Sequence, residues 1–165
     1  MASFTRRTSP ALDWTERASA VRGEPVESFA APVSGTDFFK ANLEEADVTD
    51  AFGHFAYFCR ADVSNATFDG ASLFHASVTD AVCLRTSFIR ADLQGADLGK
   101  AMPTEASLQE ARLWRANLEG ASMNSQTRLA GATGIEHTRV ASLRFEGERV
   151  EGEAVRELLV RLTRQ

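Results

Sequence analysis

The sequence predicts an all-β solenoid of stacked four-sided coils that ends in a short α-helix. Three observations lead to this fold class: an alanine recurs every five residues, an apolar residue follows each alanine at a fixed interval, and the end of the chain has the apolar spacing of a helix. A short constant period indicates a repeat architecture, in which each unit buries its apolar side chains against its neighbours. The chain divides into residues 1–30 without the repeat, residues 31–125 with it, and a C-terminal segment, 126–165.

The alanine period begins at Ala31 and ends at Ala121. It comprises 19 positions, of which 17 are alanine, and the exceptions are Thr36 and Thr86. Two residues after each of these positions lies a second regular one, and 17 of its 19 members are Val, Leu, Phe, Met or Cys. Both regular positions are therefore expected to face the core.

A period of five suits neither a helix nor a continuous strand. On a helix, five residues turn through about 500°, so the apolar positions would spiral around every face. On a strand, an odd step alternates between the two faces. The period fits a short extended side followed by a corner, so that four sides close a coil and successive coils stack about 4.8 Å apart.

Several of the five-residue units carry a distinctive motif. Residues 41–45 read Ala-Asn-Leu-Glu-Glu, residues 91–95 read Ala-Asp-Leu-Gln-Gly, and residues 116–120 read Ala-Asn-Leu-Glu-Gly. These units resemble the A(D/N)LXX repeat of the pentapeptide-repeat family. The resemblance covers residues 31–125 and implies a right-handed quadrilateral β-helix of about five coils.

The C-terminal segment is predicted to contain irregular strands, then a helix from about residue 151 to residue 162. Apolar residues recur there at the i, i+3, i+4 and i+7 spacing of one helix face. They are Val155, Leu158, Leu159 and Leu162. This face either covers the chain's own coil end or contacts a second copy. Because the resemblance implies dimerisation through such a C-terminal module, we expect these four residues to form a homodimer contact.

Composition and charge narrow the classes of protein. The formal net charge is −5, with 44% apolar and 25% charged residues, which disfavours disorder and direct nucleic-acid binding. The two cysteines cannot form a disulfide framework and suit a reducing compartment, so we expect a cytoplasmic protein. No apolar run reaches the length of a signal peptide core or a membrane span, so no membrane association is expected.

The sequence contains no catalytic or cofactor-binding motif that we recognise. Phosphate-binding glycine loops, zinc-ligand spacings and nucleophile elbows are all missing from it. The least favoured alternative is a metal site or a Cys–His dyad formed by His54, Cys59 and His75. Cys83 occupies an inward position and is expected to fill the core. We therefore expect no enzyme activity, no cofactor and no metal.

Acidic residues supply the first candidate surface. Residues 31–125 contain 13 acidic and seven basic residues, a net charge of −6. The chain is similar in this to the fluoroquinolone-resistance branch of the family, whose acidic rods bind DNA gyrase in place of DNA. The resemblance implies modulation or protection of gyrase or another type II topoisomerase by DNA mimicry. The candidate carboxylates are Glu45, Asp47, Asp50, Asp62, Asp69, Glu105 and Glu110.

Aromatic residues supply the alternative surface. Residue numbers that differ by about 20 share one side of the coil, and one side collects aromatic residues at outward positions. They are Phe52, Phe55, Phe74 and Trp114, next to Arg115. Contiguous exposed apolar residues usually mark a contact surface, here for an unknown protein partner. Two other readings stay open: residues 1–30 cover this side through Trp14 or Phe29, or a bulge at residues 52–55 turns a phenylalanine inward.

Overall fold

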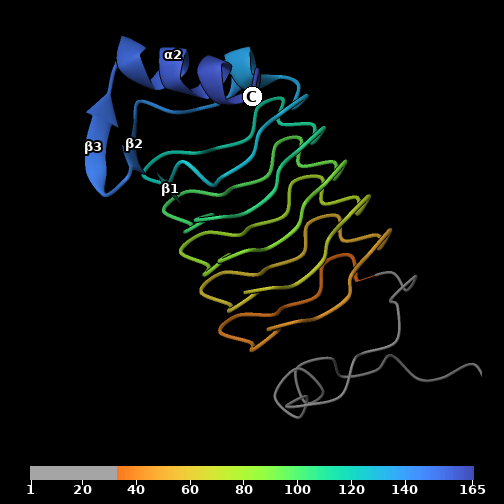
Figure 1. Ribbon diagram of the computed structural model, residues 1–165. Coiled ribbons are helices and arrows are strands. Elements are labelled where there is room, and N and C mark those ends of the chain that lie inside the picture. Colours follow the sequence, from red (N-terminus) through yellow and green to blue (C-terminus); the bar gives the residue numbers. More distant parts are fainter. Residues whose placement is uncertain (1–32) are drawn as a thin grey trace, which may run out of the picture.

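The computed structural model describes residues 33–165 (Figure 1). Its main feature is a stack of coils held by parallel bridges between residues that are 20 positions apart, such as Asp62↔Val82 and Asp92↔Arg112. Four five-residue sides therefore make one coil, as predicted. Figure 1 shows these coils stacked one upon another, with a helix across the end of the stack that lies near the C-terminus.

Backbone hydrogen bonds join each side of a coil to the next coil in both directions. The Val63 amide donates to the Val82 carbonyl at 2.9 Å, and the Asp62 amide donates to the Ala41 carbonyl of the preceding coil at 3.0 Å. Each corner is closed by a turn, in which, for example, the Ala66 amide donates to the Val63 carbonyl at 3.0 Å. Each side is thus an extended piece too short to form a ladder alone, and stacking supplies its hydrogen bonds.

The corners share one unusual backbone conformation. The last residue of each unit from Gly35 to Gly120 has a positive φ, for example 57° at Arg60 and 58° at Glu110. This left-handed conformation favours glycine, yet most corners carry a larger residue. The coil geometry therefore imposes a strained conformation that neighbouring hydrogen bonds maintain.

The core consists of the two regular positions of the repeat. Leu73, Leu93 and Leu113 are fully buried, and so are the alanines at positions 51 to 121 of the register. Central phenylalanines stack along the rod: the ring centroids of Phe68 and Phe88 are 5.2 Å apart, with an interplanar angle of 18°. The core expected from the period is confirmed.

Three less common residues at the inward positions fit their surroundings. Thr86 replaces an alanine, and its hydroxyl donates to the Val63 carbonyl at 2.8 Å in the interior. Gly53 replaces a central apolar residue, and the Leu73 side chain of the next coil takes up the space, since its Cδ2 would lie 2.9 Å from a Cβ on Gly53. Cys83 is completely buried, as expected, and this burial raises the pKa of its thiol to about 12. It fills space and has no reactive thiolate.

The coil ladder continues beyond residue 125. Ser107 pairs with Arg128, 21 positions later, and Asn117 pairs with Arg139, 22 positions later. Two single-residue insertions thus shift the register but keep the stacking. β1 (Ser122–Met123) pairs in parallel with β2 (Ser142–Phe145), which pairs antiparallel with β3 (Glu148–Glu151). The 3-10 helix η1 (Ile135–His137) lies between β1 and β2 in the chain.

Helix α2 (Glu153–Leu162) covers the end of this last coil (Figure 1). Its apolar stripe belongs to the same core cluster as Leu143 and Ile135. The stripe residues Val155, Leu158, Leu159 and Leu162 are between 0 and 7% exposed. The apolar face that the sequence analysis assigned to a homodimer contact is therefore already buried within one chain, because the coil end needs an apolar cover. No helix within residues 33–165 is long and apolar enough to span a membrane.

Candidate functional surface

One side of the solenoid carries exposed rings, and we call it the aromatic side. Its members are Phe52, His54, Phe55, Phe74, His75, Trp114 and Arg115. Phe52 is 59% exposed, Phe55 54% and Trp114 41%. The bulge considered above does not form, because Phe52 bridges Ser72 in the ordinary register and both phenylalanines point outward. The other reading, cover by residues 1–30, lies outside the described residues.

The first half of the aromatic side is a packed cluster of rings. The His75 imidazole stacks on Phe55 with a centroid distance of 5.6 Å and an interplanar angle of 5°. It also meets the edge of Phe74 at 4.3 Å, and Phe74 lies 6.2 Å from Phe55. A Cβ on Gly95 would lie 2.5 Å from the His75 ring, so the glycine of the next coil leaves room for it. These rings therefore hold one another in fixed positions on the surface.

Phe55 and His75 occupy corner positions with φ of 58° and 56°. A bulky residue in this conformation is uncommon, since smaller residues such as Gly and Asn accommodate it at lower cost. Every corner has this geometry, so the fold explains the conformation but does not explain the choice of large rings.

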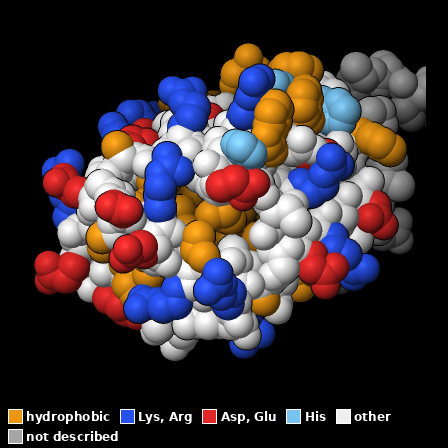
Figure 2. Space-filling model, turned by 90° about the horizontal axis from the view of Figure 1, so that it is seen from above, with side chains coloured by type: hydrophobic (Ala, Val, Ile, Leu, Met, Phe, Trp, Pro, Cys, Tyr) orange, Lys and Arg blue, Asp and Glu red, His pale blue; other side chains and the backbone are white. Residues whose placement is uncertain are grey.

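The second half of the aromatic side is cationic. The Arg115 guanidinium lies 4.2 Å from the Trp114 ring centroid, within cation–π range. Arg112 is paired with Asp92 at 3.1 Å, and His137 lies 6.2 Å from Trp114. Figure 2 shows the hydrophobic, histidine and basic side chains gathered at one edge of the molecule. The aromatic side thus has an uncharged half and a half with cations.

The candidate metal site or dyad is not assembled. His54 Nε2 is 2.6 Å from Ser72 Oγ, whereas Cys59 Sγ is 3.1 Å from Ser77 Oγ on the adjacent side. Within the described chain, residues 33–165, no three His, Cys, Asp or Glu side chains are placed to hold a metal ion. All three histidines of the sequence instead take part in the ring contacts of the aromatic side.

Three of the seven candidate carboxylates maintain the backbone. Asp47 accepts a hydrogen bond from the Thr49 amide at 3.0 Å, and Asp62 accepts one from the Ser64 amide at 3.0 Å. This contact explains why units have Asp or Asn before the central residue: the side chain closes its own turn. Asp69 accepts from the Ile89 amide of the next coil at 3.0 Å. These acids are committed to the fold.

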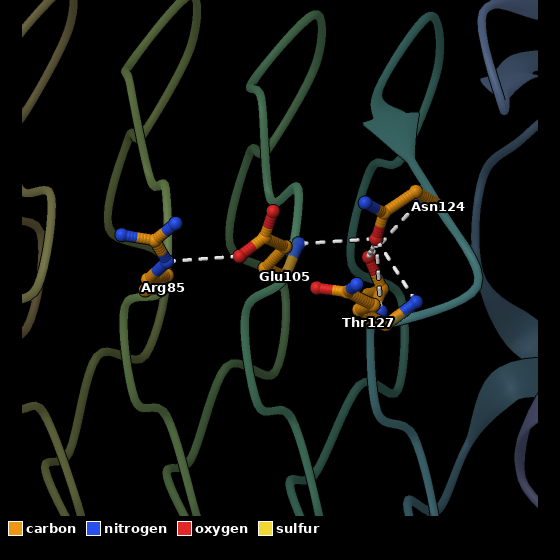
Figure 3. A network of polar contacts seen from close by, with 5 residues as sticks. Arg85, Glu105, Asn124 and Thr127 are labelled. Atoms are coloured by element: carbon orange, nitrogen blue, oxygen red, sulfur yellow. Dashed lines mark hydrogen bonds and ion pairs between the residues drawn. The ribbon is translucent and has the colours of Figure 1, made fainter.

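A fourth carboxylate, that of Glu105, belongs to a network near the C-terminal end (Figure 3). Arg85 Nε donates to it at 2.8 Å, while the Glu105 amide donates to Asn124 Oδ1 at 3.2 Å. Asn124 Oδ1 also accepts from the Thr127 amide at 3.1 Å. The network joins the corner at Glu105 to the first insertion in the next coil. Its Arg85 contact gives the Glu105 carboxylate a cationic partner.

The remaining three carboxylates, those of Glu45, Asp50 and Glu110, are exposed at corners. Within the described part of the chain they form no ion pair. Of the seven candidates, these three are the exposed ones that form neither a hydrogen bond that closes the backbone nor an ion pair within residues 33–165.

Sequence reasoning overlooked Glu119. Its carboxylate accepts from the Ala141 amide at 2.6 Å and from the Ser142 hydroxyl at 2.7 Å, and so positions the start of β2. These hydrogen bonds lower the pKa of Glu119. No sequence signal reveals this role, because the register shift brings residues 119 and 141 together.

A family comparison agrees with this geometry. The family model of pentapeptide repeats matches in eight copies between residues 36 and 133, more than half of the chain. The chain therefore belongs to the pentapeptide-repeat family, whose members form right-handed quadrilateral β-helices and generally act as structural or interaction scaffolds. No curated protein matches the sequence.

Solved structures give distant likenesses. A pentapeptide repeat protein from the Arabidopsis thaliana thylakoid lumen is 30% identical, over 61% of this chain and 63% of that chain, with a TM-score of 0.39. The aligned part is thus less than two thirds of that protein. QnrB1, a plasmid-mediated fluoroquinolone resistance protein, is 18% identical over 81% of this chain and 82% of that chain, with a TM-score of 0.48. HetL from Nostoc sp. strain PCC 7120, involved in heterocyst differentiation regulation, is 24% identical over 72% and 63%, with a TM-score of 0.26.

Proposed function

We propose that this protein is a non-enzymatic interaction rod whose aromatic side binds a protein partner. The observation that carries the proposal is the exposure of Phe52, Phe55 and Trp114 on a single side. The rings of Phe55, Phe74 and His75 form one contiguous exposed cluster, and large exposed apolar patches usually mark contact surfaces, where aromatic and Arg residues supply much of the binding energy. The ring contacts within the cluster reduce the entropy that its side chains lose on binding.

Capture of partner proteins tests this function. The full chain serves as bait, together with Phe74→Ala and Trp114→Ala, each of which removes a ring from the aromatic side. The control is Glu45→Gln, which changes a corner on another side. We expect each aromatic variant to capture at least tenfold less partner than the wild-type chain, and we expect the control to capture as much as the wild type. Equal capture by all four proteins would overturn the proposal.

A second candidate is modulation or protection of DNA gyrase by DNA mimicry. The observation that favours it is the set of three exposed carboxylates, Glu45, Asp50 and Glu110, on a rod of net charge −6. Attraction of this kind weakens with salt. The charge is sparser than that of duplex DNA, which carries one charge per about 1.7 Å.

A supercoiling titration with gyrase, with and without a fluoroquinolone and at two salt concentrations, tests the second candidate. The triple variant Glu45→Gln, Asp50→Asn and Glu110→Gln removes three charges from exposed corners. Asp80→Asn is the matched control, since Asp80 is an exposed corner acid on a mostly basic side. Mimicry would be supported if the protein inhibited gyrase, or protected it from the drug, and if this effect weakened at higher salt. The effect should also be lost in the triple variant but kept in the Asp80→Asn control. No effect of the wild-type protein at large excess would exclude it for that enzyme.

A further inference from the structure

We propose that the partner of the aromatic side is a second copy of this chain, and that two rods lie antiparallel with their aromatic sides in contact. This inference rests on the proposed function, because it takes the aromatic side to be a contact surface. It names the occupant of that surface and its orientation.

The order of residues along the aromatic side supports an antiparallel pair. Phe74 and Trp114 each lie one coil of 20 residues from Gln94, and His75 and Arg115 each lie one coil from Gly95. A twofold axis across the side at Gln94 and Gly95 therefore places the rings of one copy opposite the Trp114–Arg115 pair of the other. Such self-complementarity is what an isologous contact requires.

The distribution of charge between the two halves of the aromatic side also supports the antiparallel orientation. The half with Phe55, Phe74 and His75 presents ring faces and edges, while the other half presents the Arg115 guanidinium. An antiparallel pair brings each guanidinium to the rings of the other copy, a cation–π arrangement. A parallel pair instead brings the arginine-bearing halves of the two copies together. Like charges across an interface are unfavourable, so the antiparallel orientation is preferred.

The C-terminal cap offers no surface for a second copy. The apolar stripe of α2 covers the chain's own coil end, with Leu159 fully buried. The open edge strand β3 bears Glu148, Arg149 and Glu151, and charged edges discourage strand pairing between molecules. Of these three surfaces, the α2 stripe, the β3 edge and the aromatic side, only the aromatic side therefore presents exposed apolar groups suited to self-association.

The size of the contact sets the expected affinity. A side about 25 Å long and 20 Å wide buries roughly 500 Å² on each copy, close to the lower limit for a specific interface. We therefore expect a dimer in equilibrium with monomer at micromolar concentrations. Trp114→Ala and Arg115→Glu should each raise the dimer dissociation constant tenfold or more, since aromatic and Arg anchors dominate such contacts.

Sedimentation and disulfide trapping test the inference with the full chain. Cys59→Ser serves as the background, because Cys83 is buried. In that background we expect Gln94→Cys to form a disulfide-linked dimer under mild oxidation, since the axis brings Gln94 close to its own copy. Glu44→Cys, at the same position of a unit on another side, is the matched control and should stay monomeric.

Orientation is decided by mixing two variants. Because each cysteine variant also loses a ring, the mixture is oxidised at a concentration at least tenfold above the weakened dissociation constant. Phe74→Cys and Trp114→Cys should then crosslink to each other more than either crosslinks to itself. The proposal would be overturned if Phe74→Cys crosslinked preferentially to itself, or if the Glu44→Cys control crosslinked as much as Gln94→Cys. It would also be overturned if the protein stayed monomeric at all concentrations up to about 100 times the expected micromolar dissociation constant. A monomeric protein that still loses captured partner in Phe74→Ala would retain the proposed function and reject only self-association.

Discussion

Every corner between Val33 and Ala121 is closed by the same backbone hydrogen bond, and the amides of Thr127, Ala132 and Thr138 make this bond in the last coil too, so the two regions differ in their side-chain bonds. In the regular coils the Asp or Asn of a unit often adds a second bond, as Asp97 does to the Gly99 amide at 2.9 Å. In the last coil the second bonds come from Asn124, Thr127 and Glu119 instead. The regular coils thus repeat one kind of side-chain bond, whereas the coil with the insertions keeps the backbone bond and is stabilised by several different side-chain bonds.

The largest expected effect compares one core leucine in each region. Leu93→Ala and Leu159→Ala both remove a fully buried side chain, and each should lower the free energy of unfolding by about 3 kcal/mol. Leu93 lies in the middle of the stack, so its loss weakens the coils on both sides, whereas the loss of Leu159 loosens the cap. Hydrogen exchange checks this difference. Uniform loss of protection in both variants would contradict a cap with separate stability.

Two buried threonines at alanine positions give the next comparison. The Thr127 hydroxyl donates to the Pro103 carbonyl at 2.9 Å and accepts from the Asn124 amide at 3.1 Å, whereas the Thr86 hydroxyl makes a single bond. Thr127→Val should therefore cost about 2 kcal/mol and Thr86→Val about 1 kcal/mol. Urea unfolding measures both. Equal costs would show that the insertion does not depend on its hydroxyl.

A smaller effect is expected for the acids that close regular corners. Asp62→Ala removes the bond to the Ser64 amide and should lower the free energy of unfolding by about 1 kcal/mol. Asp50→Ala removes an exposed corner acid without a turn bond and should stay within about 0.5 kcal/mol of wild type. Thermal unfolding of the pair distinguishes structural from exposed carboxylates. The distinction between structural and exposed carboxylates is wrong if Asp50→Ala lowers the free energy of unfolding more than Asp62→Ala does.

The smallest expected effect is the pH dependence contributed by Glu119. Hydrogen bonds from Ala141 and Ser142 lower its pKa in the folded chain, so its contribution is present above the ordinary value of 4.5 and disappears as the pH falls through the folded pKa. Glu119→Gln should therefore be less stable than wild type at pH 7, and the difference should shrink below about pH 4. Urea midpoints at both pH values check this. If the difference in stability between Glu119→Gln and wild type were the same at both pH values, the effect would come from packing and not from the charge of Glu119.

The five-residue period alone determined the coil, its inward positions and the identity of the core, because those features depend on residues within one unit. Leu93, Cys83 and the alanines of the register are buried where the period places them. The pattern Asp or Asn before the central residue is local too, although its role in closing the turn became clear only from the hydrogen bonds.

The tertiary structure decided what depends on contacts between coils. Asp69 and Glu105 are engaged by residues about one coil away, Glu119 is engaged across a shifted register, and Glu45 forms no ion pair within residues 33–165. The apolar stripe of α2 is visible in the sequence, but only packing shows that it covers the chain's own last coil. The physical reason is that a periodic pattern specifies which side of a unit faces inward, whereas partners about 20 residues apart are chosen by register and by the direction in which the helix returns.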